Sequence, residues 1–205
     1  MKKIIISAFK LCLLGLFLSS CQPKPTAGNQ QDTVLESNWQ QRLKTSLPLL
    51  GHRNWILIVD KAYPAPSSAN ITVINTGQNL PEVAKQLDSL LKTQDHIRPI
   101  VYQDKELAYI DEQLVPGIDM FKKEIGLIFR SGLQVIPHTS IFQKIEDASK
   151  LFHVVVLKTA STLPYTSLFI ELDCKYWNAN SEQELRRRMQ HDSNRHEPLI
   201  TKRSK

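Results

Sequence analysis

The sequence predicts a single-domain α/β protein with a mostly parallel, helix-flanked sheet of about six strands. Short β-branched, apolar runs alternate along the chain with longer segments in which apolar residues recur every three or four positions. This alternation is typical of strands connected by helices that cover a parallel sheet. The folded part, residues 34–177, has the length of one domain with a sizeable core, and no internal repeat interrupts it.

The first elements surround a strongly apolar run. Residues 34–47 place Trp39, Leu43 and Leu47 at near-helical spacing, which predicts an amphipathic helix that ends before Pro48. Trp55–Val59 has no polar position, so we expect a central strand covered on both faces. The prolines of the following loop fix their own φ and restrict the preceding residue, so this loop is expected to be stiff.

The remaining elements follow the same alternation. Ile71–Asn75 alternates as a strand does, and Asn79 is a suitable cap for a helix over residues 80–91. Pro99 argues for an edge position or a bulge in the strand over residues 97–102. Gly132 is expected to end a helix over Ile118–Phe129. The last elements predicted are strands at Leu133–Ile136, 154–157 and 167–172, and a helix at 141–152.

The amino terminus has the pattern of a bacterial lipoprotein signal. Lys2 and Lys3 precede an apolar stretch, and residues 18–21 (LSSC) form a lipobox, so residues 1–20 are expected to be cleaved and Cys21 acylated. The stretch is too short for an ordinary membrane span. Residues 21–33 are predicted to be a flexible tether. We therefore expect a membrane-anchored protein of the bacterial cell envelope; the alternative is a plain secretory signal with an incidental cysteine.

Charge and cysteine content exclude several classes of function. The net charge of +6 arises mainly from the signal and from residues 178–205, a basic polar tail, so the domain is close to neutral and no nucleic-acid partner is expected. Cys174 has no partner for a disulfide and is predicted to be a small buried hydrophobe. We predict no metal site and no cofactor, and the chain has no nucleophile elbow, phosphate loop or dinucleotide glycine motif.

Two polar residues flank the apolar run at Trp55–Val59. His52 precedes it, and Asp60 follows at the carboxyl end, where open α/β sheets place their ligands. An imidazole oriented by a carboxylate can both donate and accept protons near neutral pH, so His52 is a candidate acid/base, and Asp60 is a candidate for its orienting partner or for the acceptor of a sugar hydroxyl group. The structural alternative is that His52 caps the preceding helix and Asp60 caps a turn.

This part of the chain resembles the opening of the RbsD/FucU family of sugar mutarotases and pyranases. It contains Gly51 and His52, then the apolar strand, then Asp60 and the proline-containing loop. A second stretch, residues 152–167, is similar to the family's buried strand and following turn. Tyr165 matches the family's tyrosine, whereas Ser167 stands where the family has asparagine, and the family's Gly-Glu pair is replaced. The order of the predicted elements also matches the family from about residue 43 to residue 172.

The resemblance implies a cofactor-free protein that binds a monosaccharide and interconverts its anomers or ring forms. It also implies a homo-oligomer in which a neighbouring chain completes each site, so that Tyr165 would serve the His52 of the adjacent subunit. A non-catalytic relative that binds a glycan or an envelope protein is the alternative. The residues that the resemblance assigns to catalysis are His52 and Asp60, and those that it assigns to sugar binding are Tyr165, Ser167, His138 and Lys158.

Overall fold

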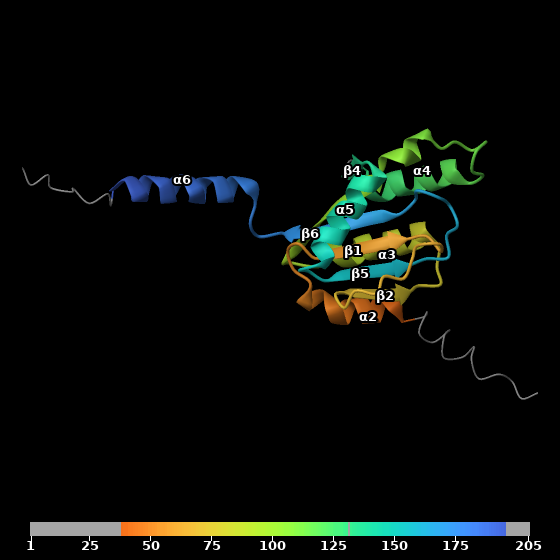
Figure 1. Cartoon of the computed structure of the whole chain (residues 1–205), viewed down its shortest axis with the longest axis horizontal. Helices are drawn as coiled ribbons and strands as arrows, with labels where there is room; N and C mark the ends of the chain where they lie inside the picture. Colours follow the sequence, from red (N-terminus) through yellow and green to blue (C-terminus); the bar gives the residue numbers. More distant parts are fainter. Residues whose placement is uncertain (1–37, 131, 196–205) are drawn as a thin grey trace, which may run out of the picture.

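The computed structural model describes residues 38–130 and 132–195 (Figure 1). The predicted signal peptide, Cys21 and the tether lie outside the described residues, and the proposed division of the chain into segments stays a prediction. The elements are α2 (Trp39–Ser46), a 3-10 helix η1 (Leu47–Leu49), β1 (Trp55–Val59), β2 (Ile71–Asn75), α3 (Leu80–Lys92), β3 (Ile97–Asp104), a 3-10 helix η2 (Lys105–Tyr109), α4 (Ile118–Phe129), β4 (Leu133–Ile136), α5 (His138–Ser149), β5 (Val154–Lys158), β6 (Leu168–Cys174) and α6 (Ala179–Arg195).

The six strands form one mixed sheet in the order β2-β5-β1-β6-β3-β4. β1 pairs in parallel with β5, which pairs in parallel with β2, and β3 pairs in parallel with β4. Only β6 runs against its neighbours, β1 and β3. Five of the six described strands therefore share one direction, which confirms the predicted mostly parallel, helix-flanked α/β fold.

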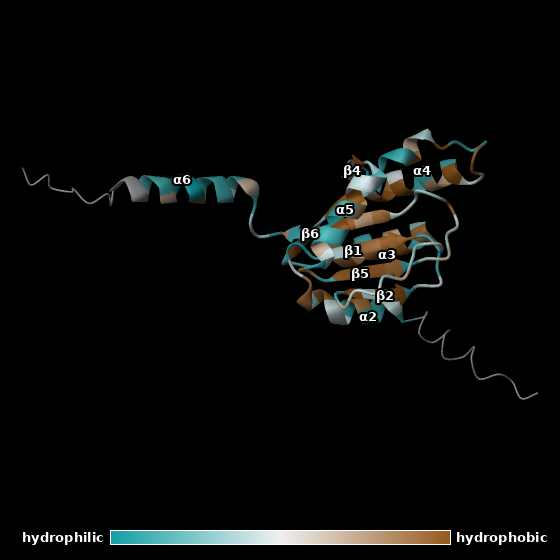
Figure 2. Cartoon of the chain, viewed as in Figure 1, coloured by the Kyte–Doolittle hydropathy of each residue, from teal (hydrophilic) through white to brown (hydrophobic). Residues whose placement is uncertain are grey.

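The sheet has a hydrophobic core on each face because β1 is apolar at every position. Ile56 and Ile58 pack in the larger core with α2, α3 and α4, whereas Trp55, Leu57 and Val59 pack in the smaller core beside α5. All five side chains of β1 are buried. Figure 2 shows the hydrophobic residues concentrated in the strands and their covering helices. The predicted central position of β1 is confirmed.

Several elements differ in their bounds from the prediction, and β3, α5 and β6 differ by at least two residues at one end. β3 extends to Asp104 because Val101–Asp104 pairs with β4. β3 lies between β6 and β4 in the sheet order, but its pairing with β4 covers only Val101–Asp104, so Pro99 itself occupies a local edge position, one of the two alternatives predicted for it. Pro99 is tolerated because it precedes the part of β3 that pairs with β4, so its missing N–H leaves no gap in that ladder. α5 begins at His138, three residues before the predicted start.

The end of α4 differs from the prediction at Gly132. Arg130 follows the helix with φ 45° and its N–H donates to Gly126 O, so an arginine takes the position of positive φ that glycine favours. Gly132 instead donates its N–H to Phe129 O at 2.9 Å. The residue that ends the helix is therefore Arg130.

The carboxyl-terminal helix α6 extends away from the sheet (Figure 1) and is mostly hydrophilic (Figure 2). Asn178 caps it, because its side-chain oxygen accepts the N–H of Ser181 at 2.9 Å. Ion pairs one turn apart, from Glu182 to Arg186 and from Glu184 to Arg188, stabilise it along its own surface. Among the residues that the structure describes, no helix is long and apolar enough to cross a membrane.

Candidate functional site

Polar residues from several strands meet at the carboxyl edge of the sheet. Asp60 follows β1, Asp104 ends β3, and Lys158 ends β5. His138 opens α5 directly after the turn from β4. Because these four strands run in the same direction, their carboxyl ends lie at one edge, which is where open α/β sheets bind ligands.

The central feature of this edge is a pair formed by His138 and Asp104. The Nδ1–H group of His138 donates to Oδ2 of Asp104 at 2.9 Å. The Asp104 side chain is completely buried, whereas 39% of the His138 side chain is exposed. A carboxylate that binds one ring nitrogen fixes the orientation of the imidazole and leaves Nε2 to face a ligand. The pair therefore has the geometry of an acid/base group.

Glu106, in the 3-10 helix η2, holds the backbone of the same histidine. Its two carboxylate oxygens both accept the backbone N–H of His138, at 3.1 and 3.0 Å. This N–H belongs to the first turn of α5, where helical N–H groups lack partners within the helix. Glu106 thus stabilises the early start of α5, and it fixes the backbone of His138 while Asp104 fixes the ring.

The environment of Asp104 opposes its ionisation. Burial is the largest influence and raises the pKa of this carboxyl group. His138 lowers the pKa through its hydrogen bond and its charge, whereas the charges of Glu106 and Asp60 raise it. The net pKa lies above the ordinary value. Oδ1 of Asp104 is buried and has no hydrogen-bond partner within the described part of the chain. An unpartnered buried oxygen is costly, and such groups concentrate at functional sites.

A hollow of about 530 Å³ opens beside His138. Its lining includes three of the predicted site residues, Asp60, His138 and Tyr165. The other residues that line it are Lys61, Ala62, Thr162, Leu163 and Pro164. The Tyr165 ring meets the His138 ring edge to face, with centroids 5.2 Å apart. Tyr165 has φ 56°, an uncommon backbone conformation that holds its ring at the hollow.

The other predicted residues at this edge differ in their roles. Oδ1 of Asp60 accepts the N–H of Ala62 at 2.7 Å, so Asp60 caps a turn and also lines the hollow. Lys158 donates from Nζ to the backbone oxygen of Tyr63 at 2.8 Å, which ties down the proline-containing loop. Ser167 is buried with 5% of its surface exposed. Lys158 and Ser167, both predicted as sugar contacts, are not among the residues that line the hollow.

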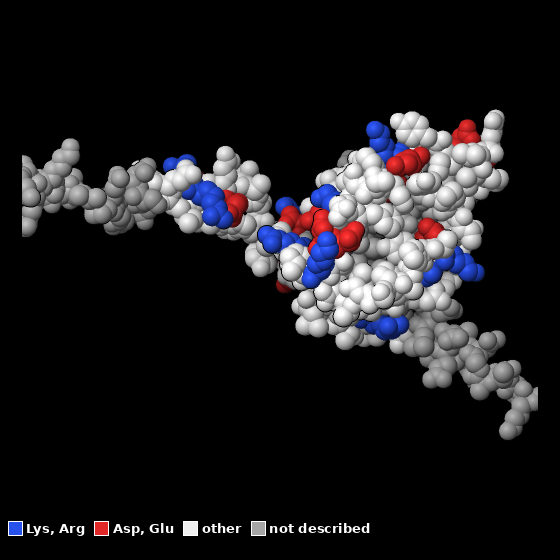
Figure 3. Space-filling model, in the orientation of Figure 1, with Lys and Arg blue, Asp and Glu red and all other residues white. Residues whose placement is uncertain are grey.

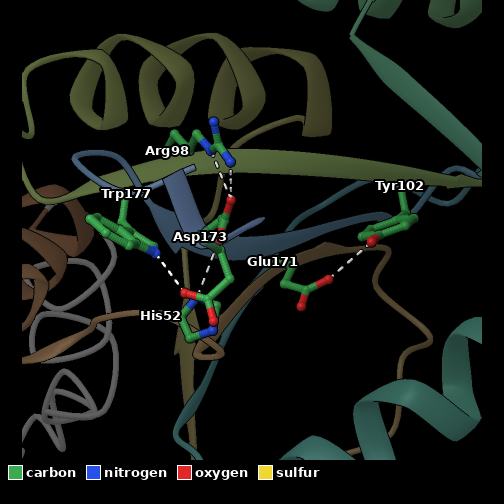
Figure 4. A network of polar contacts seen from close by, with 7 residues as sticks. His52, Arg98, Tyr102, Glu171, Asp173 and Trp177 are labelled. Carbon is green, nitrogen blue, oxygen red and sulfur yellow. Dashed lines mark hydrogen bonds and ion pairs between the residues drawn. The ribbon is translucent and has the colours of Figure 1, made fainter. Parts of the chain in front are cut away.

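His52 lies at the amino edge of the sheet, which is the end of the parallel strands opposite to the carboxyl edge, and it precedes the first residue of β1. The predicted pairing of His52 with Asp60 was therefore wrong, because the five extended residues of β1 alone span about 17 Å. The carboxylate that contacts His52 is Asp173, with 3.1 Å between Nδ1 and Oδ1. Arg98 donates from Nε and Nη2 to Oδ2 of Asp173, at 2.8 and 2.5 Å. Figure 4 shows this network.

The carboxyl group of Asp173 differs electrostatically from that of Asp104. Partial burial acts to raise the pKa of Asp173, but the hydrogen bond and charge of Arg98, the N–H of Cys174 and the contact with His52 together lower it below the ordinary value. Asp173 therefore stays ionised over the physiological range. Figure 3 shows charged side chains of both signs gathered at the end of the domain next to α6.

The sequence interpretation missed both carboxylates that contact the histidines. A signal for Asp104 and Glu106 existed, because both come shortly after the predicted strand 97–102, at the edge that had selected Asp60. Asp173 had no such signal, because it lies in the antiparallel strand β6 and meets His52 only through the pairing of distant segments. Within residues 38–130 and 132–195, no group of three or more histidine, cysteine or acidic residues could hold a metal ion.

No family model and no curated protein matches the chain. Among solved structures, it is similar to Bacillus subtilis RbsD complexed with D-ribose, with 18% identity over 63% of this chain and 89% of that chain and a TM-score of 0.44. The fucose mutarotase of Streptococcus pneumoniae in complex with L-fucose has 17% identity over 67% and 94%, with a TM-score of 0.46. FucU of Bifidobacterium longum has 16% identity over 64% and 92%, with a TM-score of 0.45. At identities of 16–18%, these similarities assign no chemistry to the residues of the site.

Proposed function

We propose that the chain binds a monosaccharide in the hollow at the carboxyl edge and interconverts its anomers or ring forms through His138. The observation that carries this proposal is the pair of His138 and Asp104, which presents an oriented imidazole to a hollow of about 530 Å³. A hollow of this volume is in the usual range for small-molecule sites. Tyr165 and Asp60 would contact sugar hydroxyl groups beside it.

The proposed reaction needs only proton transfers. A base removes the proton of the anomeric hydroxyl group, an acid protonates the ring oxygen, and the bond between the anomeric carbon and the ring oxygen breaks to give the open-chain form. Rotation of the carbonyl group and reversal of the same transfers close the ring as the other anomer. An imidazole at neutral pH suits either transfer, and such catalysis contributes roughly 10²- to 10⁴-fold.

We also propose that the chain acts as a homo-oligomer and that His52 of a second copy supplies the other proton-transfer group. Support comes from the position of His52 at the edge opposite to Asp60 and His138, since one chain cannot bring the two histidines to one sugar. His52 is held by Asp173 and half exposed, with 52% of its side chain accessible. An oriented, accessible imidazole is available to the site of a neighbour.

A non-catalytic sugar-binding module is the second candidate function. It is favoured by Lys158 and Ser167, because neither predicted sugar contact lines the hollow. With fewer polar contacts, the site would hold a sugar without positioning its anomeric centre for proton transfer.

Exchange NMR tests the proposal. Saturation transfer between the anomers of ribose, fucose, galactose and glucose would be measured with the full chain in a non-glycosidic detergent. The exchange rate should exceed the uncatalysed rate and fall in His138→Ala and in His52→Ala, while His191→Ala, an exposed histidine of α6, serves as the matched control. Sugar binding without exchange would support the non-catalytic module, and neither binding nor exchange would refute both candidates.

We propose, finally, that Cys21 carries a lipid anchor that holds the domain at the cell envelope. Support comes from the positive start of the chain and the lipobox at residues 18–21. In bacteria, Cys21→Ser should move the chain from the membrane fraction to the soluble fraction. A variant that stays in the membrane fraction would contradict the lipid anchor.

A further inference from the structure

A second hollow, of about 670 Å³, surrounds the His52 network at the amino edge of the sheet. Its lining includes His52, Arg98 and Asp173, and the aromatic residues Tyr176 and Trp177, which follow β6. These two aromatic side chains are 78% and 42% exposed. Neither contributes to the two hydrophobic cores, so they are available to a ligand.

The polar groups of this hollow are held in place before any ligand binds. Trp177 donates its indole Nε1–H to Glu182 at 2.9 Å, which fixes the ring relative to the start of α6. Arg98 fixes Asp173, and Asp173 fixes Nδ1 of His52 (Figure 4). Nε2 of His52 makes no hydrogen bond to any described residue. A rigid aromatic face therefore lines the same hollow as an oriented imidazole with one free nitrogen.

We propose that Tyr176 and Trp177 form the apolar wall against which a sugar ring packs when His52 reaches it. The C–H face of a pyranose is apolar and its edge is polar, so it matches a site that combines an aromatic face with a few oriented polar groups. Arg98 and Asp173 neutralise each other, and the other two charged residues of the lining, Arg53 and Glu182, are of opposite sign, so the lining favours an uncharged sugar over an anion. This inference rests on the proposed sugar binding, and it adds a specificity-determining pair to the half of the site that carries His52.

The tryptophans of the chain provide a direct readout. Of its three tryptophans, Trp39 and Trp55 are 1% and 3% exposed, so a change in fluorescence or in acrylamide quenching on adding sugar reports on Trp177. The test would titrate ribose, fucose, galactose and glucose into the full chain, and would measure KM and kcat for anomer exchange in parallel. Sugar should shield Trp177 from acrylamide.

The variants separate a binding wall from a structural role. Trp177→Ala and Tyr176→Ala should each raise KM roughly 2- to 13-fold with kcat little changed, because stacking of this kind contributes modestly and uniformly. Trp177→Phe should restore most of the affinity, and Leu151→Ala, a residue of equal exposure to Tyr176, should change nothing. Since both aromatic residues are exposed, folding is expected to survive, and circular dichroism would check it.

The outcomes also distinguish this inference from the proposed function. Anomer exchange with unchanged Trp177 shielding and unchanged KM in the variants would overturn the aromatic wall while the mutarotase proposal stands. Shielding of Trp177 by sugar without any exchange would support the wall and refute catalysis. Absence of both signals would refute both.

Discussion

Replacing Asp104 with asparagine removes the charge behind His138 and keeps the size of the side chain. Oδ2 of Asp104 accepts the hydrogen bond from Nδ1 of His138 at 2.9 Å, and the carboxyl group is completely buried. A hydrogen bond to a charged group contributes about 1.5 to 3 kcal/mol. If this bond acts fully in the transition state, its loss slows anomer exchange by roughly 10- to 160-fold, since about 1.4 kcal/mol corresponds to a factor of ten.

The same substitution should leave the free energy of unfolding near neutral pH unchanged or higher. Burial raises the pKa of Asp104, so the folded protein binds this proton more tightly than the unfolded chain does. The resulting contribution to stability is fully present below the unfolded-state pKa and is lost as pH rises through the raised folded-state pKa. Asparagine does not titrate, so the Asp104→Asn variant lacks this loss at higher pH.

Two measurements check this pair of effects. Exchange NMR gives the rate, and urea unfolding near pH 4 and near pH 7 gives the stability of Asp104→Asn and of wild type. Asp88→Asn serves as the control, because Asp88 pairs with Lys92 on the surface of α3. An exchange rate within about twofold of wild type would refute the role of Asp104 as a positioning residue. A variant clearly less stable than wild type near pH 7 would contradict the cost assigned to its buried charge.

Three further outcomes are expected. If each site combines two copies, mixing the inactive variants His52→Ala and His138→Ala should restore up to about a quarter of the wild-type exchange rate. Random assembly leaves about one site in four with both native histidines. No recovery after subunit exchange would contradict the composite site. Arg130→Gly should raise stability in urea by about 1 kcal/mol, because glycine adopts the positive φ of 45° without strain; an unchanged or lower urea midpoint would contradict that strain. Ile58→Ala should lower the free energy of unfolding by about 2 to 5 kcal/mol in the same assay, because Ile58 is fully buried in the central strand. A smaller decrease would show that neighbouring side chains fill the cavity.

The elements whose signals are local were predicted with their bounds. β1, β2, α4 and β4 each match the expected residues, because a continuous apolar run, an alternating run or a helical repeat determines them without help from distant segments. The bounds that depend on distant contacts were missed. β3 gains its last residues by pairing with β4, and α5 gains its first turn from the carboxylate of Glu106.

The candidate site was predicted in part for the same reason. Asp60, His138 and Tyr165 line one hollow, as expected for residues that follow parallel strands. The partner of His138 had a signal that was missed, because Asp104 follows a predicted strand at the same edge, 34 residues before His138. The partner of His52 had none, because Asp173 lies 121 residues away in an antiparallel strand. The spacing of His52 and Asp60 already argued against their contact, since an extended strand between two residues separates them by its full length.

The two histidine–aspartate pairs differ in a way that bears on the proposed mechanism. Burial opposes the charge of Asp104, whereas Arg98 keeps Asp173 ionised. A reaction that adds one proton and removes another uses two groups in unlike environments, and these pairs are unlike. They lie at opposite edges of one sheet, farther apart than a monosaccharide is long, so a single chain can use only one of them on a given sugar. If the proposed function holds, either water replaces the second group or a second copy provides it, and recovery of exchange in the mixture of His52→Ala and His138→Ala requires the second copy.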